Sequence, residues 1–479
     1  NSIFESIDDF LRGAWAWTVR RYRPSIECAQ GSIETLLTSN GGYILHLDGT
    51  CQGDSPHLMT ALDGLSKIVL GNVKLPSENA KMIVPFLRGL KKDYGTPVAM
   101  VHDMGVGILD AIRQVFPGVP DFICHFHFLR DIGKDLFELE HSMMKSSFKK
   151  HRTRTHLRKV AKKLREQILA DTQLSEALDL IQTATLGQSG VLQVPPPIKA
   201  YLLTLWALDS NADLDGIGFP FDRAQLAFFD RINKAWESIE NNPGHVPSPL
   251  VQLRKALAPV IHDKDMSRVV QKLRDKVKLF DQLREAMRIA LPNRTQGLND
   301  DGTECDINTI RAKVTTFRDE LAEAIAAKVR ADREFKKMLK QINKYWDKLF
   351  ADPILVATKN GNTLVQPQRT NNLLERFFRD LKKGLRKKSG ASSMTKALRT
   401  MLVDTPLIKN IQNESYMEAI LSGEPDLQTR FAQIDSASVR QKLRENLDHL
   451  DRIPAPLKKL LRTQGLPAKI TQYQFAATP

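Results

Sequence analysis

The stretch AMVHDMGVGILDAIRQVFPGVPDFICHFHF, residues 99–128, combines strand and helix signals in a way that decides the fold class. An apolar run ends at Asp103, a helical pattern fills residues 106–116, and a second apolar run fills residues 121–128. Strands that alternate with helices are typical of a sheet covered by helices. We therefore predict strands over 96–103 and 121–128, joined by a helix.

Upstream of this stretch, the sequence predicts three short strands and a second helix. Gly, Asp, Ser and Pro residues separate the segments as turn signals. The strands are expected over 43–50, 57–64 and 67–75, and the helix over 76–95, with Ser77 as its N-cap and Gly95 at its end. A three-stranded meander followed by helix, strand, helix and strand predicts a mixed α/β fold with a central sheet flanked by helices.

Beyond residue 130 the pattern becomes almost entirely helical, up to about residue 360. Another amphipathic helix is expected over 372–388, and a helical tail after it. The resulting parts are an N-terminal helical segment (1–40), the first part of the α/β core (41–130), a large all-helical insertion (131–360), the closing helix of the core (361–400) and a C-terminal tail (401–479).

The charge of the chain points to a polyanionic partner. The 479 residues contain 70 Lys and Arg against 55 Asp and Glu, a formal net charge of +15. Nucleic acid is the first candidate partner, and an acidic membrane surface is the second. No apolar run approaches the length of about 18 residues that a membrane span needs. Four scattered cysteines without a Cys-x-x-Cys pair favour a reducing compartment and exclude a self-contained zinc finger.

Three acids occupy positions where they could act together. Asp48 and Asp103 each end an apolar strand, and side chains at the carboxyl ends of neighbouring strands converge in α/β sheets. Glu375 lies at the edge of the apolar stripe of the helix over 372–388, so this helix could pack on the sheet and still present the carboxylate at the sheet's edge. Taken singly, either Asp could be a turn residue and Glu375 could be a surface partner of Arg379. Together they are candidates for a divalent-cation site.

At this point the chain resembles a known family, the DDE transposases with an RNase H-like catalytic domain. The segment around Asp103 resembles Mutator-like and hAT-like elements, in which Cys-x-x-His follows the second acid, here Cys124 and His127. RTNNLLERFFRDLKKGLRKKSG (369–390) resembles the closing helix of Mutator-like and related bacterial insertion-sequence transposases. An Asn precedes the catalytic Glu in these enzymes, here Asn371. A helical insertion between the second Asp and the Glu is also a feature of the family.

The resemblance implies that Asp48, Asp103 and Glu375 bind two Mg²⁺ ions, which Mn²⁺ could replace. The implied reaction is phosphodiester hydrolysis at transposon ends, followed by strand transfer into target DNA. Cys124 and His127 are implied to support the site structurally. His151 and His156 could complete a zinc site with them, but we do not expect zinc, because a buried Cys usually belongs to the core.

DNA contacts are expected on two basic segments. Residues 145–165 contain ten Lys or Arg and no acid, and residues 379–388 follow the proposed catalytic Glu. The candidate DNA-binding residues are Lys149, Lys150, Arg152, Arg154, Arg158, Asn371, Arg379, Lys382, Lys383 and Arg386. We expect a homodimer or larger oligomer without a membrane partner, located with DNA in the cytoplasm or nucleoid of a bacterium or in a nucleus.

Three other functions remain open from the sequence. His102-Asp103 superficially matches an HD-type phosphohydrolase motif, although such motifs lie on helices and this pair ends a strand. A domesticated transposase could bind DNA without catalysis. Another RNase H-like nuclease could use the same three acids.

Overall fold

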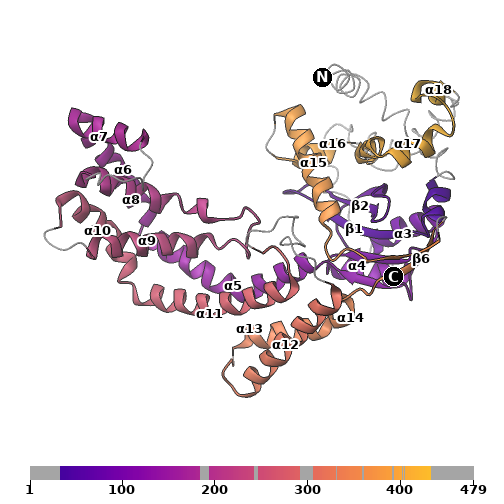
Figure 1. Ribbon diagram of the computed structural model, residues 1–479, viewed down its shortest axis with the longest axis horizontal. Helices are drawn as coiled ribbons and strands as arrows, with labels where there is room; N and C mark the ends of the chain where they lie inside the picture. Colours follow the sequence, from indigo (N-terminus) through magenta and orange to yellow (C-terminus); the bar gives the residue numbers. More distant parts are fainter. Residues whose placement is uncertain are drawn as a thin grey trace, which may run out of the picture.

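The computed structural model describes residues 33–183, 194–241, 246–291, 306–330, 332–358, 361–390, 393–401, 403 and 405–432. A sheet with its helices forms one end of the molecule, and a long helical arm extends from it (Figure 1). Residues 33–39 are helical, as expected for the end of the N-terminal segment. The remaining helices predicted before residue 33 and after residue 432 lie outside the described residues.

The sheet is mixed, and its strands lie in the order β3-β2-β1-β4-β5. The first three strands form an antiparallel meander, and β4 and β5 run parallel to β1. The strands are β1 Ile44–Thr50, β2 His57–Asp63, β3 Val69–Leu75, β4 Ala99–His102 and β5 Asp121–Ile123. The predicted α/β class and the first four predicted strands are confirmed.

Helices α3 (Ala80–Tyr94) and α4 (Val106–Val115) pack against each other and contribute to the core of the sheet. The N-cap of α3 is Asn79, whose side-chain oxygen accepts a hydrogen bond from the backbone N–H of Met82 at 3.1 Å. The prediction of Ser77 as N-cap is wrong, because its hydroxyl instead accepts a bond from the Asn79 amide. The helix ends at residue 95 as predicted, with a glycine at φ 76°.

The predicted strand over 121–128 is only partly present. β5 pairs with β4 no further than residue 123, because β4 itself ends opposite that point. Cys124 is instead the N-cap of helix α5 (His125–Lys150), and the Phe128 N–H already donates to the Cys124 carbonyl. His125 and His127 therefore lie in the first turn of a helix, and the predicted extension of the strand to residue 128 is wrong.

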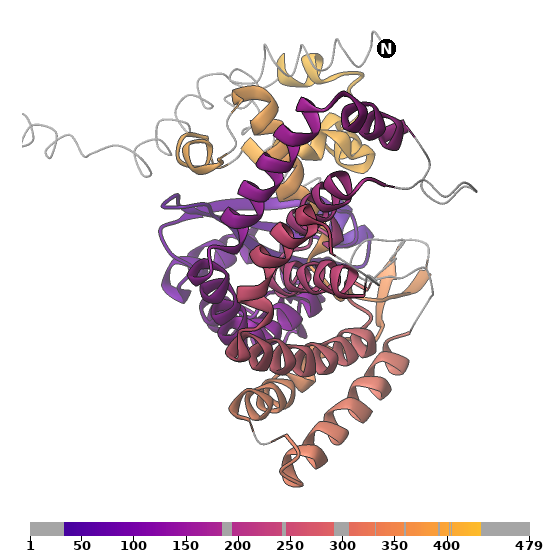
Figure 2. The same ribbon diagram turned by 90° about the vertical axis from the view of Figure 1, so that its left-hand side faces the viewer.

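The segment predicted as an all-helical insertion (131–360) is mainly helical in its described parts, but Ile354–Thr358 near its end form a strand. Its elements are α5, α6 Thr153–Ala170, α7 Thr172–Thr183, α8 Pro196–Leu208, η1 Ser210–Asp213, α9 Ala224–Glu240, α10 Ser248–Ile261, α11 Lys264–Met287, α12 Ile307–Ala326, α13 Arg333–Lys344 and α14 Trp346–Leu349. Most of these helices share one apolar core, which is separate from the core under the sheet, and α7 packs in a smaller cluster with α6 and α8. In Figure 2, which looks along the arm toward the sheet, the C-terminal helices lie above the sheet and α12 to α14 lie below it.

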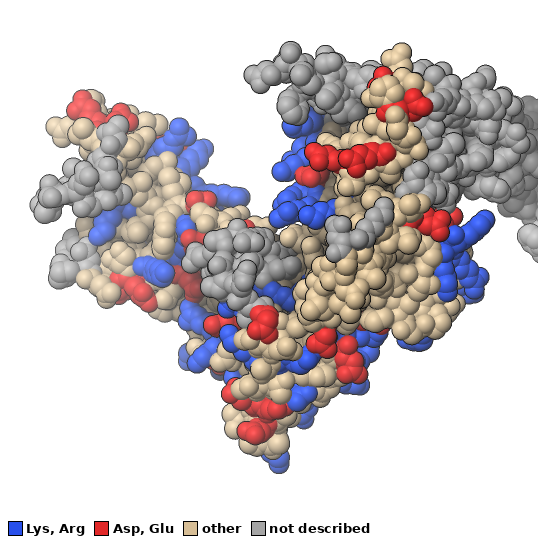
Figure 3. All heavy atoms as spheres, turned by 45° about the vertical axis from the view of Figure 1, so that its right-hand side comes forward, with Lys and Arg blue, Asp and Glu red and all other residues tan. Residues whose placement is uncertain are grey.

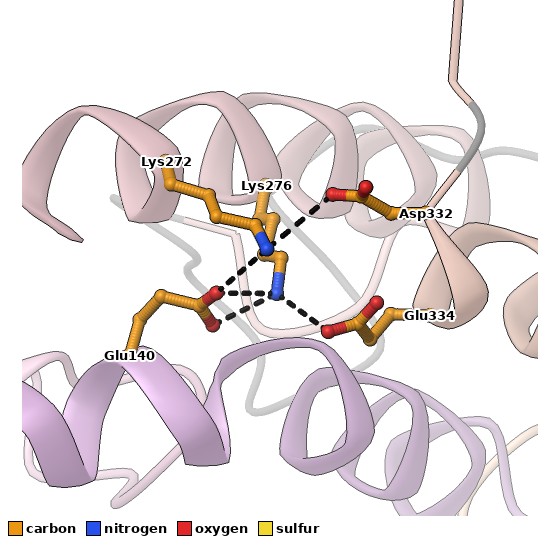
Figure 4. Close-up of polar contacts among 5 residues, drawn as sticks. All are labelled: Glu140, Lys272, Lys276, Asp332 and Glu334. Carbon is orange, nitrogen blue, oxygen red and sulfur yellow. Dashed lines mark hydrogen bonds and ion pairs between the residues drawn. The ribbon is translucent and has the colours of Figure 1, made fainter. Parts of the chain in front are cut away.

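A buried ion network joins three helices at the base of the arm (Figure 4). The Nζ of Lys276 on α11 lies 2.8 Å from both carboxylate oxygens of Glu140 on α5 and 3.2 Å from Glu334 on α13. Lys272 lies 3.5 Å from both Glu140 and Asp332. Because Lys276 and Glu140 are almost fully buried, removal of either one would leave an uncompensated charge in the core.

The chain returns to the sheet through a hairpin that the sequence patterns did not predict. Strands β6 (Ile354–Thr358) and β7 (Gly361–Val365) form it, and Ile354 and Val365 pack against residues of β1 and β4. The predicted helix over 372–388 follows as α15 (Asn372–Ser389).

The apolar stripe of α15 packs on the sheet as expected, with Leu374 in the sheet core and Leu381 against Leu58 of β2. The described part of the tail contains α16 Thr395–Thr400, η2 Thr405–Gln412, α17 Glu414–Leu421 and α18 Leu427–Ala432. No helix in the described part of the chain has both the length and the apolar character needed to cross a bilayer.

Candidate active site

Asp48 and Asp103 lie next to each other at one edge of the sheet. β1 and β4 are parallel neighbours in which Leu47 lies opposite His102. The residue that follows each of these two is one of the acids, Asp48 or Asp103. Neighbouring strands are about 4.8 Å apart, which brings the two carboxylates close together. Asp48 is only 6% exposed, and its Oδ1 accepts a hydrogen bond at 2.8 Å from the N–H of the following residue.

Asn371 attaches the start of α15 to the sheet beside these acids. Its Nδ2 donates to the carbonyl of Leu47 at 3.0 Å, and its Oδ1 accepts from Nδ1 of His46 at 2.9 Å. Its backbone N–H donates to the Sγ of Cys124 at 3.3 Å. Glu375 follows one helical turn later, with its N–H bonded to the Asn371 carbonyl at 3.0 Å. The third acid is thus held on the same edge of the sheet as the first two.

The charges of the other two acids act on Asp48. Burial raises the pKa of Asp48 well above its ordinary value, and repulsion from Asp103 and Glu375 raises it further. Burial raises the pKa of Glu375 to about 7, although the positive charges of Arg130 and Arg379 oppose this shift. Clustered carboxylates that resist ionisation form a site where an added cation is stabilising.

This donor set fits a hard divalent cation. Oxygen ligands from carboxylates are those that Mg²⁺ and Mn²⁺ prefer, and a cation would offset the repulsion that raises the pKa of Asp48. As the side chains stand, no three His, Cys, Asp or Glu residues among those described are close enough to enclose an ion. Any ion held here would therefore also rely on oxygens of the substrate or water.

A fourth acid, Glu78, was not among the residues selected from the sequence. Its negative charge contributes to the raised pKa of Asp48, and its Oε1 lies 3.0 Å from Nδ1 of His57. A Cβ at Gly49 would lie 2.3 Å from this carboxylate, and a Cβ at Gly107 would lie 2.0 Å from the Glu78 carbonyl. The lack of a Cβ at Gly107 thus lets the backbone of α4 approach the backbone at Glu78 closely. Glu78 follows β3 in a loop without an apolar pattern, so the sequence offered little signal for it.

Cys124 and His127 lie beside the acids, as the resemblance implied. Burial raises the pKa of Cys124 to about 12, so the thiol stays protonated. Burial lowers the pKa of His127 to about 4, and its Nε2 lies 3.9 Å from Oε1 of Glu375. Since the imidazole is neutral near neutral pH, this is a polar contact and not an ion pair.

The zinc site considered from the sequence does not form. His151 follows the C-terminal end of α5, 24 residues beyond His127, which corresponds to about 36 Å along the helix. Its Nε2 lies 2.8 Å from a carboxylate oxygen of Asp263. His156 is still farther along the chain, on α6. Neither can complete a ligand set with Cys124 and His127.

His102 is a neighbour of the site and faces away from it. The residue is fully buried, its Nδ1 lies 2.6 Å from the Asp103 carbonyl, and its Nε2 lies 3.2 Å from Oδ2 of Asp121. Burial alone would raise the pKa of Asp121, but hydrogen bonds from His102 and Lys348 lower it to about 2. His102 therefore connects the Asp103 carbonyl to the side chain of Asp121 on β5 and holds the Asp103 backbone in place.

Of the ten residues predicted to contact DNA, most are exposed, but some are occupied by contacts within the protein. Two residues do not fit the prediction. Asn371 is fully buried and bonded within the protein, so its side chain has no access to DNA. Arg154 is half-buried, with its guanidinium 3.8 Å from the centre of the Phe228 ring. The other eight are exposed: Lys149, Lys150, Arg152, Arg158, Arg379, Lys382, Lys383 and Arg386.

The exposed cations of α15 border a hollow between the arm and the sheet end of the molecule (Figure 3). Lys and Arg side chains gather on the side of this hollow where α15 lies. Arg376 and Lys387 are also exposed on α15, which makes six exposed cations between residues 376 and 387. A single exposed acid, Asp380, lies among them. Such a surface attracts a polyanion.

Comparison with known proteins adds no family to this description. No family model matches the chain, and no curated protein matches its sequence. Its function is therefore inferred from the site itself.

Proposed function

We propose that the protein is a DNA transposase that hydrolyses phosphodiester bonds at transposon ends and joins those ends to target DNA. One observation carries the proposal: Asp48, Asp103 and Glu375 come from three distant parts of the chain and lie together at one edge of the sheet. Clustered carboxylates of this kind suit metal-assisted phosphoryl transfer.

The strand order supports an RNase H-like core as the framework for this chemistry. The order β3-β2-β1-β4-β5, with an antiparallel meander and two strands parallel to β1, is the arrangement expected for such a core. Asp48 lies near the carboxyl end of β1, Asp103 directly follows the parallel strand β4, and α15 brings the third acid to the same edge. The helical arm is inserted between the second and third acid, as in the family that the sequence resembles.

The residues of the chain would hold and orient the reacting groups. Two Mg²⁺ ions bound by the three acids would activate the attacking water or 3′-hydroxyl and stabilise the leaving oxygen. Asp48 and Asp103 are fixed by the strands, and Glu375 is fixed through Asn371. Rigid elements preserve the alignment that an in-line displacement needs.

DNA would lie in the hollow, against the exposed cations of α15. Arg379, Lys382 and Arg386 continue along the helix from Glu375, so phosphates bound there lead toward the acids. Lys149, Lys150 and their neighbours offer a second basic surface where α5 meets α6. Because two element ends must be joined in one event, we also propose that the protein acts as a homodimer or larger oligomer on DNA.

Strand transfer with pre-cleaved element ends in Mg²⁺ tests this proposal. The substrate carries the terminal sequences that flank the gene. Asp103→Asn and Glu375→Gln should each lower the rate of joining at least about 100-fold, because each removes a carboxylate from the metal site. Asp110→Asn on α4, an exposed acid paired with Arg113, is the matched control and should leave the rate unchanged.

Three outcomes would contradict the proposal in different ways. Wild-type joining by both active-site variants would remove the acids from the mechanism. If the protein binds DNA but shows no cleavage that Asp103→Asn abolishes, a domesticated DNA-binding protein is favoured. Metal-dependent cleavage without joining would favour another RNase H-like nuclease.

A further inference from the structure

Arg130 lies on α5 one helical turn after His127, on the same side of the helix. Residues three apart on a helix are neighbours on its surface. The Nε2 of His127 lies 3.9 Å from Oε1 of Glu375, so this side of α5 faces the third acid. Arg130 is exposed, which leaves its guanidinium accessible at the mouth of the site.

Backbone contacts fix the start of α5 relative to α15. The N–H of His125 donates to the carbonyl of Arg369 at 2.9 Å, and the Sγ of Cys124 accepts from the N–H of Asn371 at 3.3 Å. Arg130 follows less than two turns later on this helix. It therefore keeps its place beside Glu375.

The charge of Arg130 is not used by an ion pair among the described residues, whereas several arginines elsewhere in the arm are paired. Arg231 lies 2.5 Å from Asp213, and Arg274 pairs with Asp230. The positive charge of Arg130 opposes ionisation of His127 and favours ionisation of Glu375, so its guanidinium lies near enough to act on both. A free guanidinium offers paired N–H donors that match two oxygens of a phosphate.

We propose that Arg130 binds the non-bridging oxygens of the scissile phosphate, from the side of the site opposite the sheet. This inference rests on the proposed function and adds a substrate-binding residue to it. The acids and their cations would hold the phosphate from the sheet, and Arg130 would hold it from the arm. The arm would then take part in catalysis and would not serve for DNA binding alone.

Phosphorothioate substitution at the scissile phosphate tests this contact. Single-turnover cleavage is measured in Mn²⁺, which tolerates sulfur as a ligand, with the Rp and Sp isomers supplied separately. The wild type should cleave one isomer more slowly, because sulfur is a poor acceptor for the guanidinium. Arg130→Ala should lower cleavage of the normal substrate about 100-fold, as loss of one charge-stabilising donor does in other enzymes. The same variant should remove the difference between the isomers.

Two further variants separate this role from a general effect of charge or folding. Arg130→Lys retains the charge but not the paired donors, so it should recover only part of the rate. Arg113→Ala removes an exposed arginine from α4 and should leave rate and isomer preference unchanged. An unfolding temperature of Arg130→Ala equal to that of the wild type would confirm that the fold is intact.

Several results would overturn the inference. One is an equal loss on both isomers in Arg130→Ala with the wild-type preference kept, and another is full recovery by Arg130→Lys. If the wild type does not cleave DNA, or if Asp103→Asn leaves its cleavage unchanged, the proposed function is overturned, and this inference with it. An active wild type with an unaffected Arg130→Ala would overturn this inference alone.

Discussion

Asn371 determines where the third acid lies. Its side chain bonds to His46 and Leu47 on β1, its backbone bonds to Cys124, and Glu375 follows one turn later. A single buried side chain thus connects the sheet, the first turn of the arm and the helix with the third acid. Loss of this side chain should move Glu375 more than it unfolds the protein.

We expect Asn371→Ala to lower strand transfer at least about tenfold and to destabilise the fold by about 2 kcal/mol. It leaves the buried Leu47 carbonyl and the ring nitrogen of His46 without partners, which carries a desolvation cost. Urea unfolding and joining rates measure the two effects. Asn372→Ala, one residue later and half-buried, is the matched control. Equal effects of the two variants would contradict the role of Asn371.

The raised pKa of Glu375 makes stability depend on pH in the metal-free protein. The folded state binds this proton up to about pH 7, whereas the ordinary pKa of the group is 4.5. Since the folded state holds more protons between these values, the free energy of unfolding should fall as pH rises through this window. Glu375→Gln stays neutral, so it should be more stable than wild type at pH 8, by on the order of 1–3 kcal/mol.

Urea unfolding at several pH values, with EDTA present, measures this effect. Glu166→Gln on α6, an exposed acid paired with Lys162, should leave the pH dependence unchanged. A Glu375→Gln variant less stable than wild type at pH 8 would mean that the Glu375 carboxylate is not destabilised by burial.

At the scale of elements, close contact between α3 and α4 supports the edge of the sheet where the acids lie. A Cβ at Gly107 would lie 2.0 Å from the Glu78 carbonyl, whereas a Cβ at Gly89 would meet nothing within 4 Å. We expect Gly107→Ala to destabilise the fold by more than about 2 kcal/mol, because backbone atoms would have to move. Gly89→Ala, inside α3, should instead stabilise it by up to about 1 kcal/mol. Thermal unfolding of both variants measures this, and equal shifts of the same sign would contradict the packing.

The elements that sequence patterns predicted well are those with a clear period. β1 to β4 have short apolar runs between turn residues, and α15 has an apolar stripe with helical spacing. The run DFICHFHF was misread, because its alternation continues past the point where β4 ends and no partner strand remains. The hairpin of β6 and β7 was missed, although its Asn-Gly at residues 360–361 is a turn signal.

For the site, the sequence could predict only residues that belong to periodic elements. Asp48 and Asp103 end apolar runs and Glu375 borders an apolar stripe, so each had a local signal. Glu78 and Arg130 had none, because the tertiary packing of α3 and α5 brings them to the acids. Asn371 was assigned to DNA from its position before the Glu, but burial gives it a structural role.

At the scale of the whole molecule, the hollow and its basic border should determine DNA affinity. A triple alanine variant would remove three exposed cations of α15, namely Lys382, Lys383 and Arg386. It should lower affinity for duplex DNA and reduce the slope of log K against log salt by up to about 2.7, because each phosphate that the protein no longer neutralises lowers the slope by about 0.9.

The matched control removes three exposed cations of α3, namely Lys81, Arg88 and Lys92, and should leave the slope unchanged. Fluorescence anisotropy across a salt series measures both variants. Equal slopes for the two would mean that DNA does not follow α15.

The most direct test of the central claim is to locate Mn²⁺ by anomalous diffraction in crystals of the protein with DNA. We expect two sites about 3.5–4 Å apart, bound by Asp48, Asp103 and Glu375 together with phosphate oxygens. Crystals of Asp103→Asn grown in the same way should lose at least one site. Mn²⁺ bound elsewhere, with the three carboxylates free of metal beside a bound DNA phosphate, would contradict the account.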